Sequence, residues 1–303
     1  MRAKASPSPQ ADILGHPNAA RAAPARVRQP LRVRAQRAGM WALIAGSVVV
    51  AAFPLLWTLT TSLKPMEDIA AFPPRLLPET VTLEHYRDVA TQSDMPEYFV
   101  HSSVVTAASI GFTLLLATPA GYAAARFRFR GKTVLLFVLL STVMIPGTVI
   151  LVPLYVLASR LALLDTYLVL VLVYTAWRVP MVLWIMKSFF EAIPVEMEEA
   201  AMVDGCGRFQ AMWRIALPLS GPGLAASAIL ILVYVWTEFI LALTLTSKLR
   251  TVTVGLYYYM TGYGIEWGRL TAAVILTLVP VLAAFFLFQR SFLQGLTAGA
   301  LKG

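Results

Sequence analysis

The sequence predicts an all-α integral membrane protein with six transmembrane helices and a helical loop on the cytoplasmic face. Composition, apolar runs and the distribution of basic residues lead to this fold class. Of the 303 residues, 58% are hydrophobic and 14% are charged, and the mean hydropathy is +0.70. Soluble domains are usually about 45–50% apolar and about 25% charged. These values exclude a water-soluble enzyme, a disordered regulator and a fibrous protein.

Six apolar runs are each long enough to cross the roughly 30 Å of hydrocarbon in a bilayer, which takes about 20 residues. They are continuous rather than alternating, which favours helices over a membrane β-barrel. The runs cover residues 39–61, 99–125, 133–158, 166–186, 220–246 and 270–288. We therefore expect one six-span domain over residues 39–303, preceded by a tail of residues 1–38.

This tail is basic, with eight Lys and Arg against Asp12 alone. Prolines interrupt it, which predicts disorder rather than an amphipathic helix. Its arginines precede the first span, where anionic membrane lipids attract basic residues. The Arg-rich composition also fits a mitochondrial targeting peptide, and this alternative stays open. Because the tail carries +7 of the net charge of +9, the charge does not call for a nucleic acid partner.

The basic residues also predict the orientation of the chain. Seventeen of the 25 Lys and Arg lie in the tail, in the loops 126–132 and 187–214, and at the C-terminal end. In a six-span chain all of these lie on one side. Loops rich in Lys and Arg stay in the cytoplasm. We therefore expect both termini in the cytoplasm.

The sequence has no residue pattern typical of a catalytic or metal site. Cys206 is the only cysteine, and the three histidines do not have metal-site spacing. No G-x-x-x-x-G-K-[ST], H-E-x-x-H or G-x-S-x-G string occurs. We therefore expect no enzyme activity and no bound cofactor in this chain.

The cytoplasmic loop 188–219 predicts two short helices. Pro194 suits the start of the first helix, because its missing N–H needs no partner there. The first turn then holds Glu196, Glu198 and Glu199, at the end where the helix dipole favours carboxylates. Gly205 fits a left-handed stop, and a second helix over about 208–216 is ended by Pro218. The alternative is an amphipathic connector that rests on the bilayer.

The same loop carries a spaced motif. Glu199-Ala200-Ala201 is followed after three residues by Gly205, nine residues later by Ile215, and then by Leu217-Pro218. This string resembles E-A-A-x3-G-x9-I-x-L-P, the coupling-loop signature of ABC importer permeases, and it lies before the last two spans as in that family. The resemblance implies that an ATPase subunit docks on Glu199, Ala200, Ala201, Asp204, Gly205, Ile215, Leu217 and Pro218.

Three further segments look like the sugar-importer branch, more narrowly the second permease of the maltose type. They are residues 123–131, 144–155 and 288–300, and the resemblance covers about 39–303. The chain departs from the family at His101, where Asn is common. It also departs at Trp236-Thr237-Glu238-Phe239, where Trp-Asn-Asp-Phe is usual. These departures leave the identity of the sugar open.

The resemblance implies a type I ABC importer permease in a bacterial plasma membrane. With a homologous permease it would form the channel for a sugar or oligosaccharide delivered by an external substrate-binding protein. An ATPase dimer would complete the complex and would bind ATP and Mg. A related polar solute such as a glycerol phosphodiester is an alternative cargo. A secondary transporter is a further alternative, although the internal repeats typical of such carriers are not seen in the sequence.

Two charged residues lie within the predicted spans, Arg178 in the fourth and Glu238 in the fifth. Charges inside a membrane are costly and usually face a cavity or a partner. Tyr234 precedes Glu238 by one helical turn, and Trp236 lies between them. These four residues are candidates for the translocation path. The alternative is that Arg178 and Glu238 pair with each other or with the partner subunit and only hold helices together.

The last outer loop, residues 247–269, is rich in aromatic residues. Tyr257, Tyr258, Tyr259 and Tyr263 fit ordinary anchors at the membrane surface. The family resemblance instead implies that they contact the binding protein, and the glycines at 255, 262 and 264 would then give the loop a flexible reach. The first outer loop, residues 62–98, has a net charge of −4 and would add to the same docking surface.

Overall fold

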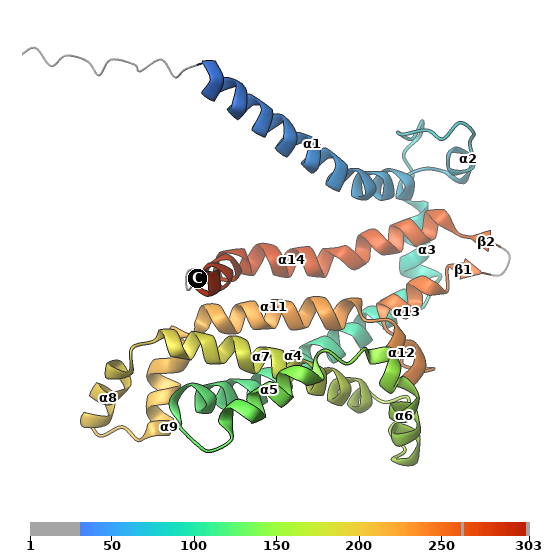
Figure 1. The fold of residues 1–303 in the computed structure, drawn as a ribbon. Helices are drawn as coiled ribbons and strands as arrows, with labels where there is room; N and C mark the ends of the chain where they lie inside the picture. The colour runs from blue at the N-terminus through green and yellow to red at the C-terminus, as the bar shows by residue number, and fades with distance from the viewer. Residues whose placement is uncertain (1–30, 262–263, 301–303) are drawn as a thin grey trace, which may run out of the picture. The chain divides into compact units, whose positions relative to one another are not determined.

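The computed structural model describes residues 31–261 and 264–300, which are mostly helical (Figure 1). The helices are α1 (Leu31–Ser62), α2 (Met66–Ile69), α3 (Glu84–Thr91), α4 (Met95–Arg126), α5 (Lys132–Thr142), α6 (Gly147–Arg160), α7 (Tyr167–Ala192), α8 (Val195–Val203), α9 (Arg208–Ala211), the π-helical turn η1 (Met212–Ala216), α10 (Leu217–Leu219), α11 (Gly221–Thr237), α12 (Ile240–Leu245), α13 (Val252–Tyr257) and α14 (Trp267–Ala300). The strands β1 (Met260–Thr261) and β2 (Gly264–Ile265) form an antiparallel hairpin.

The chain divides into two compact units, residues 1–53 and 54–303, and α1 begins in the first and ends in the second. Within the first unit, α1 starts at Leu31, directly after Pro30. Helix α1 therefore includes residues 31–38 of the predicted tail. No proline follows Pro30 until Pro54, and the Arg, Ala and Gln side chains in between favour helix. Residues 1–30 of the predicted tail lie outside the described residues.

Four helices are long and apolar enough to cross a membrane alone: residues 39–62 of α1, α4, α7, and residues 267–289 of α14. Two further pairs of helices are long and apolar enough to cross a membrane only when the two members of a pair are counted together. The helices α5 and α6 meet at a 91° bend, and the segment from α9 to α10 meets α11 at a 73° bend. Counting each pair as one span gives the six crossings that the apolar runs predict.

The third and fifth runs are not continuous helices, contrary to expectation. Residues 143–146 interrupt the third, and Pro146 stands at the start of α6 with extended backbone. A proline cannot donate to the preceding turn and disfavours helix in the residue before it. The fifth run begins as α11, breaks at Glu238 and Phe239, and resumes as the short α12.

The core of the second unit forms where α4 packs along α7, with α11 beside both of them and α14 against α11 (Figure 1). Gly121 allows the close approach of α4 and α7, because a Cβ there would lie 2.9 Å from Cβ of Met186 and 3.0 Å from the carbonyl oxygen of Leu183. Small residues allow such contact between membrane helices. Large apolar side chains on the outer faces, such as Phe137 at 69% exposure, are available to lipid.

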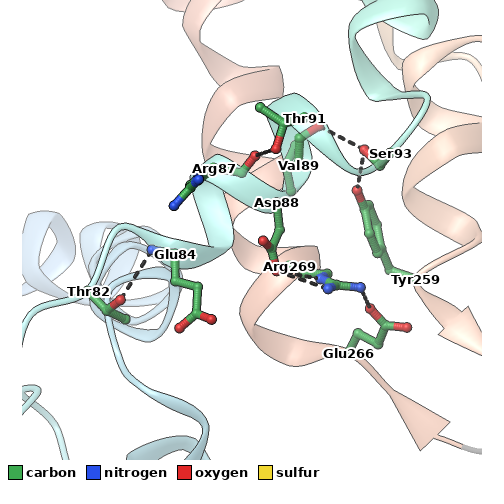
Figure 2. A network of polar contacts seen from close by, with 10 residues as sticks. All are labelled: Thr82, Glu84, Arg87, Asp88, Val89, Thr91, Ser93, Tyr259, Glu266 and Arg269. Atoms are coloured by element: carbon green, nitrogen blue, oxygen red, sulfur yellow. Dashed lines mark hydrogen bonds and ion pairs between the residues drawn. The ribbon is translucent and has the colours of Figure 1, made fainter.

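The loops at the end of the second unit opposite α8 are joined by polar contacts (Figure 1). Figure 2 shows Arg269 of α14 donating to Asp88 of α3 at 2.9 and 3.1 Å and to Glu266 at 3.2 Å. In the same network the Tyr259 hydroxyl donates to Ser93 Oγ at 3.1 Å. These bonds join the loops 62–98 and 247–269, which are far apart in the sequence.

Candidate functional site

Helix α8 is the first element of the candidate coupling site. It begins after Pro194 and ends at Val203, Asp204 caps it, and Gly205 follows with φ of +93°. The predicted left-handed stop is confirmed. The N–H of Cys206 then donates to the carbonyl of Ala201 at 3.0 Å, a bond that closes the helix end in the way left-handed caps do.

The motif residues of α8 form an open surface. Glu199, Ala200 and Asp204 are exposed and Ala201 is half-buried. A Cβ added at Gly205 would meet nothing within 4 Å. Alanine and glycine leave a shallow surface that another protein can approach closely.

The neighbouring carboxylate, Glu198, points the other way and is buried at 3% exposure. Its Oε1 accepts from Nε of Arg126 at 2.8 Å, and its Oε2 accepts from the Tyr122 hydroxyl at 2.5 Å. Arg126 also donates to the carbonyl of Ile193 at 2.9 Å. We call Tyr122, Arg126 and Glu198 the α4–α8 clamp. It ties α8 to the end of a membrane-spanning helix.

The sequence pattern does not single out this clamp. Three glutamates of α8 fit the start of a helix equally well, and Arg126 is one of many basic residues that predict the orientation of the chain. The available signal was the difference in direction between successive helical residues, about 100° each. That signal shows that Glu198 and Glu199 face differently, but not which of them faces α4.

The second half of the motif lies on the segment α9–η1–α10. Ile215 and Leu217 are half-buried and Pro218 is exposed. The expected stop at Pro218 is wrong, because the helix runs on to Leu219 and bends at Ser220. Ser220 is fully buried, and its hydroxyl donates to the carbonyl of Leu217 at 2.9 Å. The segment therefore leads directly into α11.

Aromatic side chains mark the outer face of this segment. Phe209 is 70% exposed and Trp213 is 49% exposed, and their rings stand edge to face at 6.1 Å. Met212 and Ala216 face inward and are buried. Exposed aromatic side chains beside the bare surface of α8 are typical of an interaction surface.

Within the membrane region, Arg178 of α7 stacks on Tyr234 of α11, with the guanidinium carbon 3.5 Å from the ring centre. Tyr174 stands edge to face with Tyr234 at 6.3 Å. The Tyr174 hydroxyl donates to Glu238 at 2.7 Å, and Glu238 also accepts from the N–H groups of Leu241 and Ala242. Glu238 therefore caps α12 and joins it to α7. Among the described residues no ion pair links Glu238 to Arg178, so the pairing of these two residues with each other is wrong, whereas pairing with a partner subunit stays a prediction.

Trp236, the fourth path candidate, is not brought together with Arg178 and Tyr234. It is buried at 5% exposure, packs near Phe99, and donates from Nε1 to the carbonyl of Thr277 in α14 at 3.1 Å. Its position two residues after Tyr234 turns it by about 200° around α11. It serves helix packing in this chain.

The tyrosines of the last outer loop differ in exposure. Tyr257 and Tyr258 are 50% and 47% exposed, whereas Tyr259 is 8% exposed and bonded to Ser93 (Figure 2). Burial raises the pKa of the Tyr259 hydroxyl. Tyr259 is therefore not available as a contact residue, and Tyr263 lies outside the described residues.

The glycines of this loop are expected to make it flexible, and the structure describes two of them. Gly255 is helical and packed, since a Cβ there would clash with Tyr98 and Met95. It serves close packing instead. Gly264 has φ of +138°, a backbone conformation that favours glycine, and position 262 lies outside the described residues.

Asp165 holds the start of the same loop. Its carboxylate accepts from the N–H groups of Ser247, Lys248 and Leu249 at 2.8–3.0 Å, and from the Ser247 hydroxyl. Partial burial raises the pKa of this carboxyl, but these hydrogen bonds outweigh it and hold the pKa at about 2. Asp165 itself has φ of +61°, which Asp tolerates better than most residues.

Comparison with known proteins agrees with this arrangement. The family described as "Binding-protein-dependent transport system inner membrane component" matches residues 117–297. The probable ABC transporter permease protein y4oR of Sinorhizobium fredii is 36% identical over 263 residues, which is 86% of this chain and 93% of that protein. The sulfoquinovosyl glycerol transport system permease SmoH of Agrobacterium fabrum is 34% identical over 86% of this chain and 93% of that protein.

The trehalose/maltose transport system permease MalG of Thermococcus litoralis is 33% identical over 86% of this chain and 96% of that protein. Among solved structures, a chain of a bacterial ABC transporter that imports alginate has the same fold. Its TM-score is 0.76 at 20% identity, over 87% of this chain and 99% of that one. The family match covers more than half of the sequence, and the relatives exceed 30% identity over most of it. The chain therefore belongs to the inner-membrane components of binding-protein-dependent transport systems.

Proposed function

We propose that this chain is the permease subunit of an ATP-driven importer of a sugar or oligosaccharide. The observation that carries the proposal is α8, which has an exposed surface of small residues and is anchored by a buried ion pair to a membrane-spanning helix. Relatives whose names state a cargo include permeases for sulfoquinovosyl glycerol and for trehalose or maltose, which supports a sugar as the cargo. A homologous permease would complete the channel, and an external binding protein would deliver the cargo.

The ATPase partner would seat against Glu199, Ala200, Ala201 and Gly205. Two connections would transmit its movement. The α4–α8 clamp leads to α4, and the segment α9–η1–α10 leads through Ser220 to α11. Coupling needs a docked element that is rigid and placed differently in two states. ATP and Mg would be bound by two copies of that partner.

The orientation proposed for the complex places both termini and α8 in the cytoplasm of a bacterial cell. The excess of Lys and Arg in the tail and in the loops 126–132 and 187–214 supports this placement. The exposed Tyr257 and Tyr258 would then face the binding protein from outside, beside the outer loops that Arg269 joins.

Reconstitution tests the proposal. Proteoliposomes with the complete complex and the binding protein should take up the sugar only with ATP inside, and vanadate should block uptake. Uptake that continues without ATP, driven by an ion gradient, would identify a secondary transporter and contradict the proposal. Calorimetry on the binding protein should find sugar binding, and binding of a glycerol phosphodiester in place of sugars would identify the alternative cargo.

A further inference from the structure

In the described part of the chain, the membrane region holds a guanidinium whose charge has no acidic partner. Arg178 lies near the middle of α7 and is half-buried. Among the described residues, no carboxylate lies within ion-pair distance of it. Its Nε is buried without a hydrogen-bond partner, and its Nη1 lies 3.9 Å from Met181 Sδ. An arginine inside a membrane normally has a partner or faces a water-filled cavity.

The acidic residue that ends α11, the helix of Tyr234, already has hydrogen-bond partners. Glu238 accepts from Tyr174, Leu241 and Ala242, so its oxygens serve the cap of α12. Tyr234 covers one face of the guanidinium at 3.5 Å, and the buried Nε on its edge has no acceptor among the described residues. The N–H groups on the edge of a guanidinium can donate two parallel hydrogen bonds to one anionic group. An arginine that stacks on an aromatic ring can therefore bind a carboxylate or a sulfonate carried by a sugar ring.

We propose that Arg178 selects a negatively charged sugar as cargo, with Tyr234 holding the guanidinium in position. The inference rests on the proposed importer function and narrows its substrate class. A neutral sugar would leave the positive charge without compensation within the membrane, whereas an acidic one supplies the missing counter-charge. Arg178 acts here as a specificity-determining residue, and Tyr234 acts as a positioning residue.

The test uses the reconstituted complex with its binding protein and two matched probes. One is a uronate-containing oligosaccharide, and the other is the same molecule with the carboxylate reduced to an alcohol. We expect uptake of the acidic probe to exceed that of the reduced probe. Arg178→Gln should lower acidic uptake about tenfold or more, since one charge-assisted hydrogen bond has an effect of that order. Arg178→Lys keeps the charge but loses the paired hydrogen bonds and the stacking on Tyr234, so it should retain only part of the acidic uptake. Arg160→Gln removes a cation at the exposed end of α6 and should have no effect.

The possible outcomes separate the inference from the proposed importer function. A loss confined to the acidic probe, with assembly and binding-protein-stimulated ATPase intact, supports the inference. An equal loss for both probes, or a binding protein that binds only the reduced probe, overturns it while the importer function stands. A reduced yield of assembled Arg178→Gln complex on a sizing column also overturns it, because it assigns Arg178 to the partner permease. An absence of ATP-driven uptake in the unaltered complex would instead refute the proposed function.

Discussion

At the scale of single residues, the buried Glu198 makes the sharpest prediction. Glu198→Gln removes the partner of a buried arginine, a kind of change that typically costs about 3–5 kcal/mol. We expect α8 to loosen from α4, so that the complex still binds its ATPase but no longer stimulates hydrolysis when the loaded binding protein is added. Stimulated ATPase activity in proteoliposomes measures this.

Glu199→Gln is the matched control, because the adjacent carboxylate is exposed and outside the clamp. The clamp has no coupling role if both variants keep full stimulation. Glu199→Lys, which reverses the charge on the docking surface, should instead weaken association with the ATPase.

Substitutions at two nearby glycines can distinguish the effect of backbone strain from the effect of steric crowding. Neither Gly205 nor Gly207 would bring a Cβ within 4 Å of other atoms, but Gly205 has φ of +93° and Gly207 has φ of −72°. A left-handed residue with a Cβ costs roughly 1–2 kcal/mol. Gly205→Ala should therefore reduce transport while the protein still inserts, and Gly207→Ala should transport normally. Equal activities in an uptake assay would show that the left-handed stop is dispensable.

Asp165 predicts a pH dependence of the last outer loop. Its folded pKa of about 2 lies below the ordinary value of 3.8. The stabilisation from its carboxylate is therefore fully present above about pH 4 and is lost as the pH falls towards 2. Hydrogen exchange at residues 247–249, corrected for intrinsic rates, should rise over this interval. Asp165→Asn should exchange faster already at pH 6, and an unchanged rate there would contradict the assignment.

At the scale of helices, the contact between α4 and α7 depends on Gly121. A Cβ at this position would come within 2.9–3.1 Å of Met186, Leu183 and Lys187. Overpacking of this kind typically costs about 1–3 kcal/mol. Gly121→Val should lower the thermal unfolding temperature of the purified protein. Gly111 lies on the same helix with nothing within 4 Å of an added Cβ, so Gly111→Val should change it little.

At the scale of the whole molecule, the orientation can be tested directly. A cysteine placed at position 130, in a chain with Cys206 replaced by serine, should react with a membrane-impermeant thiol reagent only after the cells are opened. Labelling of intact spheroplasts at position 130 would reverse the proposed topology, and with it the placement of α8.

The sequence by itself determined the class of the molecule. The six apolar runs and the uneven distribution of Lys and Arg are properties of consecutive residues, so they require no knowledge of packing. The coupling motif and the left-handed Gly205 were likewise predictable, because a helix stop depends on local backbone preferences. Even the break in the third span has a local cause in Pro146.

Only the tertiary structure decided which side chains face inward. Glu198 and Glu199, or Tyr258 and Tyr259, are adjacent and chemically alike, yet one of each pair is buried and the other exposed. Glu238 likewise caps α12 instead of pairing with Arg178. Successive helical residues differ by about 100° in direction, so whether each side chain is buried or exposed depends on where a neighbouring helix lies. That position comes from contacts between segments far apart in the chain, such as Arg126 with Glu198, which no local pattern encodes.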